Sequence, residues 1–112
     1  MKVLWFSRHQ MSTEQLDALK SRLGEVELVQ VDKTITNVSE ISEEMKDCDV
    51  LAIVAPIGLQ QQFLRVSNGR PVIVAVSERV FTKDENGNES KVDFRFVKWE
   101  RLVKIDVIKE DF

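Results

Sequence analysis

Short apolar runs alternate with helix-like stretches along the first two thirds of the chain. Strands are predicted at residues 2–6 (KVLWF), 26–32 (VELVQVD), 49–56 (DVLAIVAP) and 71–77 (PVIVAVS). The three segments between them place apolar residues at helical spacing. Continuous apolar strands with little alternation are usually buried on both faces, as in parallel sheets. This order predicts parallel strands joined by helical crossovers.

Capping residues mark the predicted helix ends. Ser12 and Gln15 fit a capping box that starts a helix at about Thr13, and Leu23-Gly24 ends it. Asn37 with Glu40 forms a second such pair, and Asn68-Gly69 follows the third helix as a stop signal. Right-handed crossovers place helices on both faces of a parallel sheet. We therefore expect a small α/β domain with a Rossmann-like or flavodoxin-like, three-layer layout.

The last third of the chain has no helical period. Asn86-Gly87 is a hairpin signal, across which residues 79–83 and 91–97 would pair antiparallel. Residues 101–109 (RLVKIDVIK) also alternate and predict one more strand. We expect one domain over residues 1–112, with a parallel part at 1–77 and an antiparallel hairpin extension at 78–112.

Composition narrows the class of protein. A chain of 112 residues that is 43% hydrophobic suits one domain with one core. The net charge is −3 and the charges are interspersed, which disfavours nucleic-acid binding. A single cysteine, Cys48, excludes an internal disulfide and a cysteine-based zinc site, and we predict no metal or cofactor. The longest apolar stretch, residues 50–59, is half of the ~20 residues that a membrane span needs, and residues 1–9 lack the features of a signal peptide, so we expect a cytoplasmic protein.

A binding site is expected where the first strand ends, at Ser7-Arg8-His9. Open parallel sheets bind ligands outside the carboxyl ends of their strands, where the strand order reverses. The first strand borders that reversal in both common orders, 2-1-3-4 and 3-2-1-4. Pro56 and the segment Ser77 to Arg79 follow neighbouring strands and would lie close by.

The chemistry at this corner favours an anionic small molecule, such as a nucleotide or a phosphorylated metabolite. The free N–H groups of the following helix, with the guanidinium forks of Arg8 and Arg79, suit a phosphate or carboxylate. His9 is the only histidine and could transfer a proton near neutral pH. The loop directly after the first strand contains no glycine, which argues against a dinucleotide-binding or Walker-type phosphate site. The candidate ligand-binding residues are Ser7, Arg8, His9, Ser12, Thr13, Pro56, Ser77 and Arg79.

Four of these candidates also have a purely structural interpretation. Ser12 is then the helix cap and Arg8 a salt-bridge partner at a strand end. Ser77 and Arg79 are then the polar start of the hairpin extension.

The segment FSRHQMST resembles the Arg-His-Gly motif that ends the first strand in the histidine phosphatase superfamily. In that family the histidine is phosphorylated and the arginine holds the phosphate, roles that would fall on His9 and Arg8. Gln10 stands where the family has glycine, and no second histidine is present, so a complete histidine phosphatase is rejected. At the level of the fold alone, the pattern is similar to CRISPR-associated Rossmann-fold domains, which bind nucleotides and pair as dimers. A shared fold does not establish a shared function.

Three functions stay open, of which ligand binding at the strand corner ranks first. The second is a homodimeric or structural role for the hairpin extension, where Phe94, Phe96 and Trp99 are candidate interface anchors, although such aromatics are also common in cores. The third, an enzyme, is a phosphoester hydrolase or transferase with His9 as its catalytic general acid or base.

Overall fold

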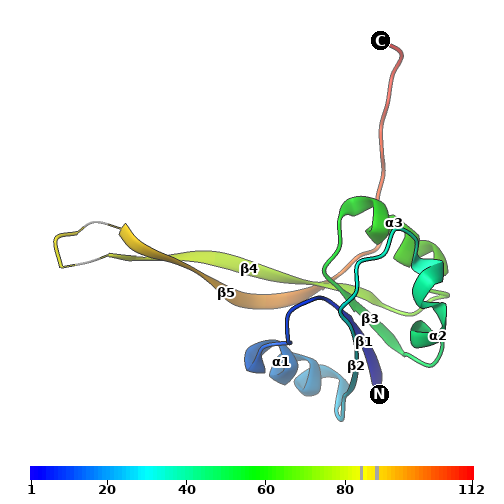
Figure 1. Cartoon of the computed structure of the whole chain (residues 1–112), viewed down its shortest axis with the longest axis horizontal. Coiled ribbons are helices and arrows are strands. Elements are labelled where there is room, and N and C mark those ends of the chain that lie inside the picture. The colour runs from blue at the N-terminus through cyan, green and yellow to red at the C-terminus, as the bar shows by residue number, and fades with distance from the viewer. Residues whose placement is uncertain (84, 88) are drawn as a thin grey trace.

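A five-stranded mixed sheet with helices forms the body of the protein in a computed structural model (Figure 1). The structure describes residues 1–83, 85–87 and 89–112, without the side chains of 89–91. The strands are β1 (Lys2–Phe6), β2 (Glu27–Val31), β3 (Val50–Ile53), β4 (Val72–Lys83) and β5 (Glu89–Arg101). The helices are α1 (Thr13–Leu23), the 3-10 turn η1 (Val38–Ile41), α2 (Ser42–Met45) and α3 (Ile57–Val66). The predicted α/β class is confirmed.

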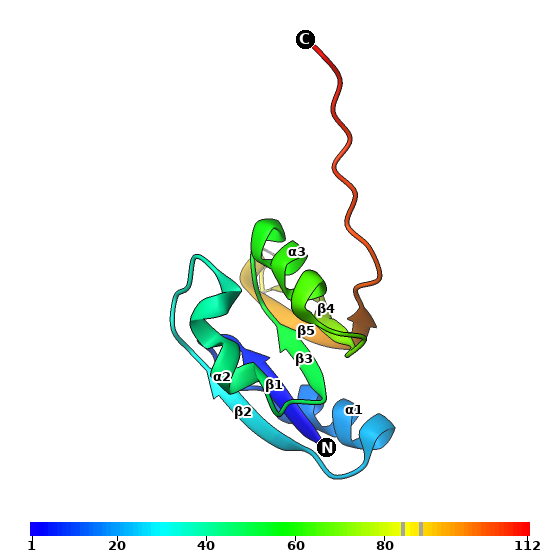
Figure 2. The same ribbon diagram turned by 90° about the vertical axis from the view of Figure 1, so that its right-hand side faces the viewer.

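The sheet order is β2-β1-β3-β4-β5, with the first four strands parallel and β5 antiparallel to β4. Side chains of β1 alternate between two buried clusters, because successive residues of a strand point to opposite faces. Val3 and Trp5 pack on the face that α1 covers, whereas Leu4 and Phe6 pack on the face that η1, α2 and α3 cover (Figure 2). Helices therefore lie on both faces of the sheet, as predicted.

The predicted caps are present. The Ser12 hydroxyl accepts a hydrogen bond from Gln15 N at 3.1 Å, and the Gln15 side chain accepts one from Ser12 N at 2.9 Å. Asn37 and Glu40 form the second capping box. Asn68 and Gly69 both have positive φ, at 56° and 82°, which explains their place after α3.

Arg70 holds the end of α2 against the end of α3, and no acidic side chain of the described residues forms a salt bridge with it. Its Nη1 donates to the carbonyl oxygens of Met45 and Cys48, at 2.7 and 3.1 Å. Its Nε and Nη2 donate to the carbonyls of Ser67 and Val66. The guanidinium thus donates to carbonyl groups at the ends of two helices, of which those of Met45 and Ser67 also accept a backbone N–H.

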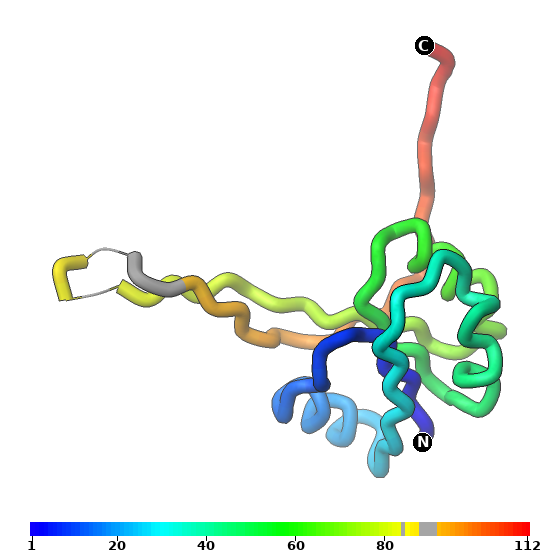
Figure 3. Tube along the Cα trace, in the orientation of Figure 1, coloured from blue at the N-terminus to red at the C-terminus, as the bar shows by residue number. Residues whose placement is uncertain are grey.

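The sequence predicts that the fourth strand ends at Ser77. In the structure β4 continues to Lys83. Its pairing with β5 runs from Ile73 opposite Arg101 to Lys83 opposite Glu89, so the strand is kept extended by its antiparallel partner. We call residues 77–83 and 89–96 the arm, which projects from the body (Figures 1 and 3). The antiparallel pairing predicted between 79–83 and 91–97 is confirmed in its direction, but residues 79–83 lie opposite 89–94, and Arg95 and Phe96 lie opposite Glu78 and Ser77. The turn of the arm contains Asn86-Gly87, while residues 84 and 88 lie outside the described part of the chain.

The prediction of an additional strand at residues 101–109 is wrong. Only Arg101 belongs to a strand, and residues 102–112 form none. Leu102 N donates to Val72 O at 2.8 Å, after which the chain leaves the sheet (Figure 2). A strand beside β5 would need a reversal after Arg101, and residues 97–112 contain no glycine, proline or asparagine to make one.

Within the described residues, no helix has the length and apolar character that a bilayer span requires.

Candidate functional site

The strand order reverses between β1 and β3. From β1 the chain moves to β2 on one side and then to β3 on the other. Of the two orders considered from the sequence, the structure has 2-1-3-4. A ligand of such a sheet lies outside the carboxyl ends of the strands at the reversal.

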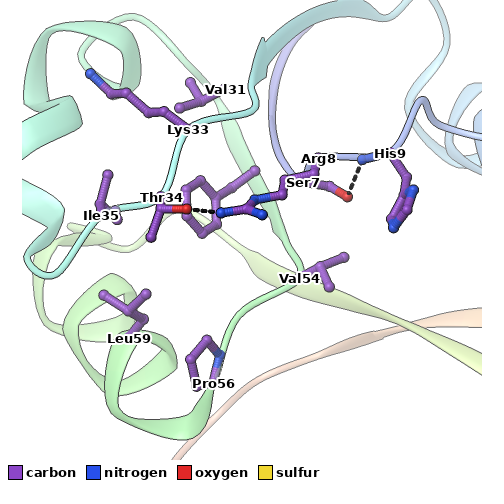
Figure 4. A pocket seen from close by; sticks show the side chains of 11 residues that line it. Ser7, Arg8, His9, Val31, Lys33, Thr34, Ile35, Val54, Pro56 and Leu59 are labelled. Carbon is purple, nitrogen blue, oxygen red and sulfur yellow. Dashed lines mark hydrogen bonds between the residues drawn. The ribbon is translucent and has the colours of Figure 1, made fainter.

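A cavity of about 290 Å³ lies at this place (Figure 4). Its volume is near the lower end of small-molecule sites, roughly 300–1,000 Å³. Apolar side chains form most of its wall, namely Phe6, Val31, Ile35, Val54, Pro56 and Leu59. The polar lining residues are Ser7, Arg8, His9, Lys33 and Thr34.

Arg8 is the cation that faces the cavity. Its side chain reaches toward the loop after β2, where Nη2 donates to Thr34 Oγ1 (Figure 4). No carboxylate of the described residues forms a salt bridge with Arg8. Because a guanidinium has five N–H donors, it can bind an anion in addition to Thr34.

Lys33 contributes less charge to the cavity than its position suggests. Its Nζ lies 3.8 Å from Glu44 Oε1 and 3.5 Å from the Glu40 carbonyl oxygen. Figure 4 shows the side chain directed away from Arg8. The positive charge at the site therefore rests mainly on Arg8.

The backbone of Ser7-Arg8-His9 is fixed by three side chains. Trp5 Nε1 donates to the His9 carbonyl at 2.8 Å, and Gln30 Nε2 donates to the carbonyls of Ser7 and His9, both at 3.1 Å. The buried Ser7 hydroxyl accepts a hydrogen bond from His9 N at 3.1 Å. These bonds hold the segment that carries Arg8 in one conformation.

The His9 ring lies on the other side of Ser7 from Thr34 (Figure 4). No hydroxyl or carboxylate of the described residues hydrogen-bonds to this ring. The Ser7 hydroxyl bonds to the backbone instead, so Ser7 and His9 are not joined as a nucleophile and its base.

Glu40 fixes the loop that forms the other wall. Its Oε2 accepts hydrogen bonds from Thr36 N at 2.8 Å, Asn37 N at 2.9 Å and Thr36 Oγ1 at 3.2 Å. These backbone donors lower the pKa of the Glu40 carboxyl. The same loop carries Thr34 and Ile35 of the cavity wall.

Glu40→Gln is expected to lower stability at neutral pH and to make no difference in strong acid. A carboxyl whose pKa is lower in the folded state stabilises that state when ionised, and the effect is lost as the pH falls through the lowered pKa. The free energy of unfolding in urea, measured between neutral pH and strong acid, checks this. Glu43→Gln on α2 is the control and should follow the wild type, whereas parallel profiles for Glu40→Gln and wild type would contradict the prediction.

Four predicted site residues line the cavity: Ser7, Arg8, His9 and Pro56. Ser12 and Thr13 do not line it, because Ser12 caps α1 and that helix covers the other face of the sheet. Ser77 and Arg79 do not line it either, because β4 carries them into the arm, where the Arg79 guanidinium lies 5.9 Å from the centre of the Phe94 ring.

Sequence reasoning missed most of the loop after β2 and the residues around α3. Thr34 and Ile35 follow β2, Val54 follows β3, and Leu59 lies in α3. The carboxyl ends of neighbouring parallel strands share one edge, so the order 2-1-3 would have indicated the loop. Val54 is 56% exposed although it is large and apolar, which marks the cavity mouth.

Within the described residues, no group of three histidine, cysteine, aspartate or glutamate side chains could hold a metal ion.

No protein-family model, curated protein or solved structure matches this chain.

Proposed function

We propose that the cavity beside Arg8 binds a small molecule with one anionic group and a partly apolar body, such as a nucleotide or a phosphorylated metabolite. The observation that carries the proposal is the position of Arg8: a guanidinium that has no carboxylate partner among the described residues, beside an apolar cavity at the reversal of strand order. We interpret this order, with helices on both faces, as a Rossmann-like fold of the flavodoxin-like type. A cytoplasmic setting is part of the same proposal.

The start of α3 supports an anion at this place. Pro56 lines the cavity and precedes α3, a helix of ten residues without a side-chain N-cap. Its first N–H groups carry the partial positive charge of a helix N-terminus. An anion held by Arg8 would lie at the same edge of the sheet, with its apolar part against Phe6, Val31 and Leu59.

A thermal-shift panel of mononucleotides, sugar phosphates and inorganic phosphate tests the proposal. At least one nucleotide or metabolite is expected to raise the Tm at millimolar concentration, since a ligand at ten times its Kd stabilises by about 1.4 kcal/mol. Arg8→Ala should abolish the shift. Arg65→Ala, which removes an exposed arginine of α3 outside the cavity, should retain it.

Two results would overturn the proposal: no stabilisation by any member of the panel, or an equal shift in Arg8→Ala and wild type. His9→Ala in the same panel measures whether the histidine contributes to binding.

A further inference from the structure

The outer edge of β5 has no strand beside it in the described part of the chain. β5 is the last strand of the sheet and runs for 13 residues, from Glu89 to Arg101. Long edge strands pair readily with other chains unless they are short, bulged or covered. β5 has register shifts against β4 opposite Val76/Ser77 and Thr82/Lys83, but between them residues 91–96 pair regularly with β4 and contain neither proline nor glycine to prevent such pairing.

On one face of the arm the β5 side chains are apolar and exposed, while β4 places Arg79 opposite Phe94 on the same face. Val92, Phe94 and Phe96 point to this face, since alternate residues of a strand share a side. Phe94 is 70% exposed and Val92 49%, and Phe81, opposite Val92 on β4, is 50% exposed. Phe96 continues the stripe toward the body, where its ring centre lies 5.8 Å from that of Trp99.

The other face of the arm carries opposite charges. Asp93 and Arg95 lie there on β5, both exposed. Arg95 also donates through Nε and Nη2 to Glu78 Oε1 on β4, at 3.1 and 2.9 Å. Two residues of opposite sign thus flank Phe94 in the sequence.

We propose that β5 pairs antiparallel with β5 of a second copy, about a two-fold axis at Phe94, so that the two sheets become continuous. In this register Phe94 lies opposite Phe94 of the second copy, and Val92 lies opposite Phe96. On the other face, Asp93 lies opposite Arg95 of the second copy, and the symmetry repeats that pair. Each Arg95 then lies between Glu78 of its own chain and Asp93 of the other.

Charge disfavours the two adjacent axes, and the apolar stripe from Val92 to Phe96 favours an axis at its centre, which makes a second copy the partner. An axis at Asp93 would place two aspartates opposite each other, and an axis at Arg95 would place two arginines opposite each other, both of which are unfavourable. A shift by one residue would place the apolar face against the charged face. Only the axis at Phe94 makes the segment from Val92 to Phe96 complementary to itself. No residue of β5 lines the ligand cavity, so this proposal does not depend on the proposed function.

A charge-reversal experiment tests the pairing, with mass measured by light scattering or sedimentation at tens of micromolar. The wild type is expected to be a dimer. Asp93→Arg leaves arginine at both flanking positions and Arg95→Asp leaves aspartate at both, so each variant alone should be monomeric. An equimolar mixture of the two variants should dimerise, because opposite charges then face each other across the axis. Glu43→Arg on α2 is the control and should remain dimeric.

Cross-linking tests the position of the axis. Two Cα atoms directly opposite in an antiparallel pair are about 4.5–5.5 Å apart, which suits a disulfide. In a Cys48→Ala background, Phe94→Cys should therefore cross-link on mild oxidation, whereas Val92→Cys should not, because residue 92 faces residue 96. A monomeric wild type, a mixture that stays monomeric, or equal cross-linking of the two variants would each overturn the proposal.

Discussion

Replacing Phe63 with alanine is expected to lower the free energy of unfolding by about 3–5 kcal/mol. Phe63 is fully buried, and its ring centre lies 5.4 Å from that of Phe6 in the core beside the cavity. It is the one buried residue of α3, so the variant loses the main anchor of that helix. Because domains are stable by only about 5–15 kcal/mol, the loss is a large fraction of the total. Urea unfolding followed by circular dichroism measures it.

Two matched variants show whether burial is the cause. Phe112→Ala removes the same side chain where it is fully exposed and should change stability by less than about 0.5 kcal/mol. Phe63→Leu keeps an apolar side chain in the core and should fall between wild type and Phe63→Ala. A loss below about 1 kcal/mol for Phe63→Ala would show that the core does not depend on this ring.

Features set by neighbours in the sequence were predictable. The capping boxes at Ser12 and Asn37 form because the cap and its partner lie three residues apart, and the hydrogen bonds require no distant contact. The apolar strand at residues 50–53 is buried because its composition suits no other environment. Such elements depend little on the rest of the chain.

Features that depend on pairing with distant parts of the chain were not predictable from the sequence. Alternation at 101–109 is compatible with a strand, but a strand also needs an edge and a turn that brings the chain to it. The polar segment from Ser77 to Arg79 resembled a strand end, yet it faces β5, which keeps it extended. Neither outcome is encoded within a few residues of the segment itself.

The residues of the candidate site likewise divide into those that could be predicted from the sequence and those that could not. Ser7, Arg8 and His9 line the cavity at the corner where the sequence placed a candidate site, because the first strand borders the reversal in both common orders. Val54 and Leu59 could be included only once β3 was known to lie beside β1, which is true of only one of the two orders. The position of the first strand beside the reversal thus indicated the wall formed by residues 7–9. The other wall could be identified only from the observed order of the strands.

The three aromatic residues predicted as interface anchors have different surroundings. Phe94 is exposed on the arm, whereas Phe96 and Trp99 are half-buried. A register shift at Val76/Ser77 leaves Val97 without a partner on β4, so the alternation changes phase and Phe96 can meet Trp99 on one face. Of the three, Phe94 is the most exposed, and Phe96, half-buried beside Trp99, lies on the same face and takes part in the proposed pairing.

Trp99→Ala is expected to lower the free energy of unfolding by about 3 kcal/mol, as a core residue would. The Trp99 ring meets Trp5 edge to face, with centres 5.9 Å apart, and its Nε1 donates to the Gln15 carbonyl at 3.0 Å. These contacts join β5 to α1 and to β1. Trp99→Phe keeps a ring but loses the donor, so it should lose about 1 kcal/mol from the hydrogen bond, plus a smaller packing loss.

Measuring both Trp99 variants in the Asp93→Arg background separates this effect from association. That background is expected to be monomeric, so a loss of stability there originates within one chain. The Tm of a dimer depends on protein concentration, whereas that of a monomer does not. If Trp99 acts within the chain, Trp99→Ala lowers the Tm equally at all concentrations in that background. A destabilisation that appears only when the chain can dimerise would instead place Trp99 at the interface.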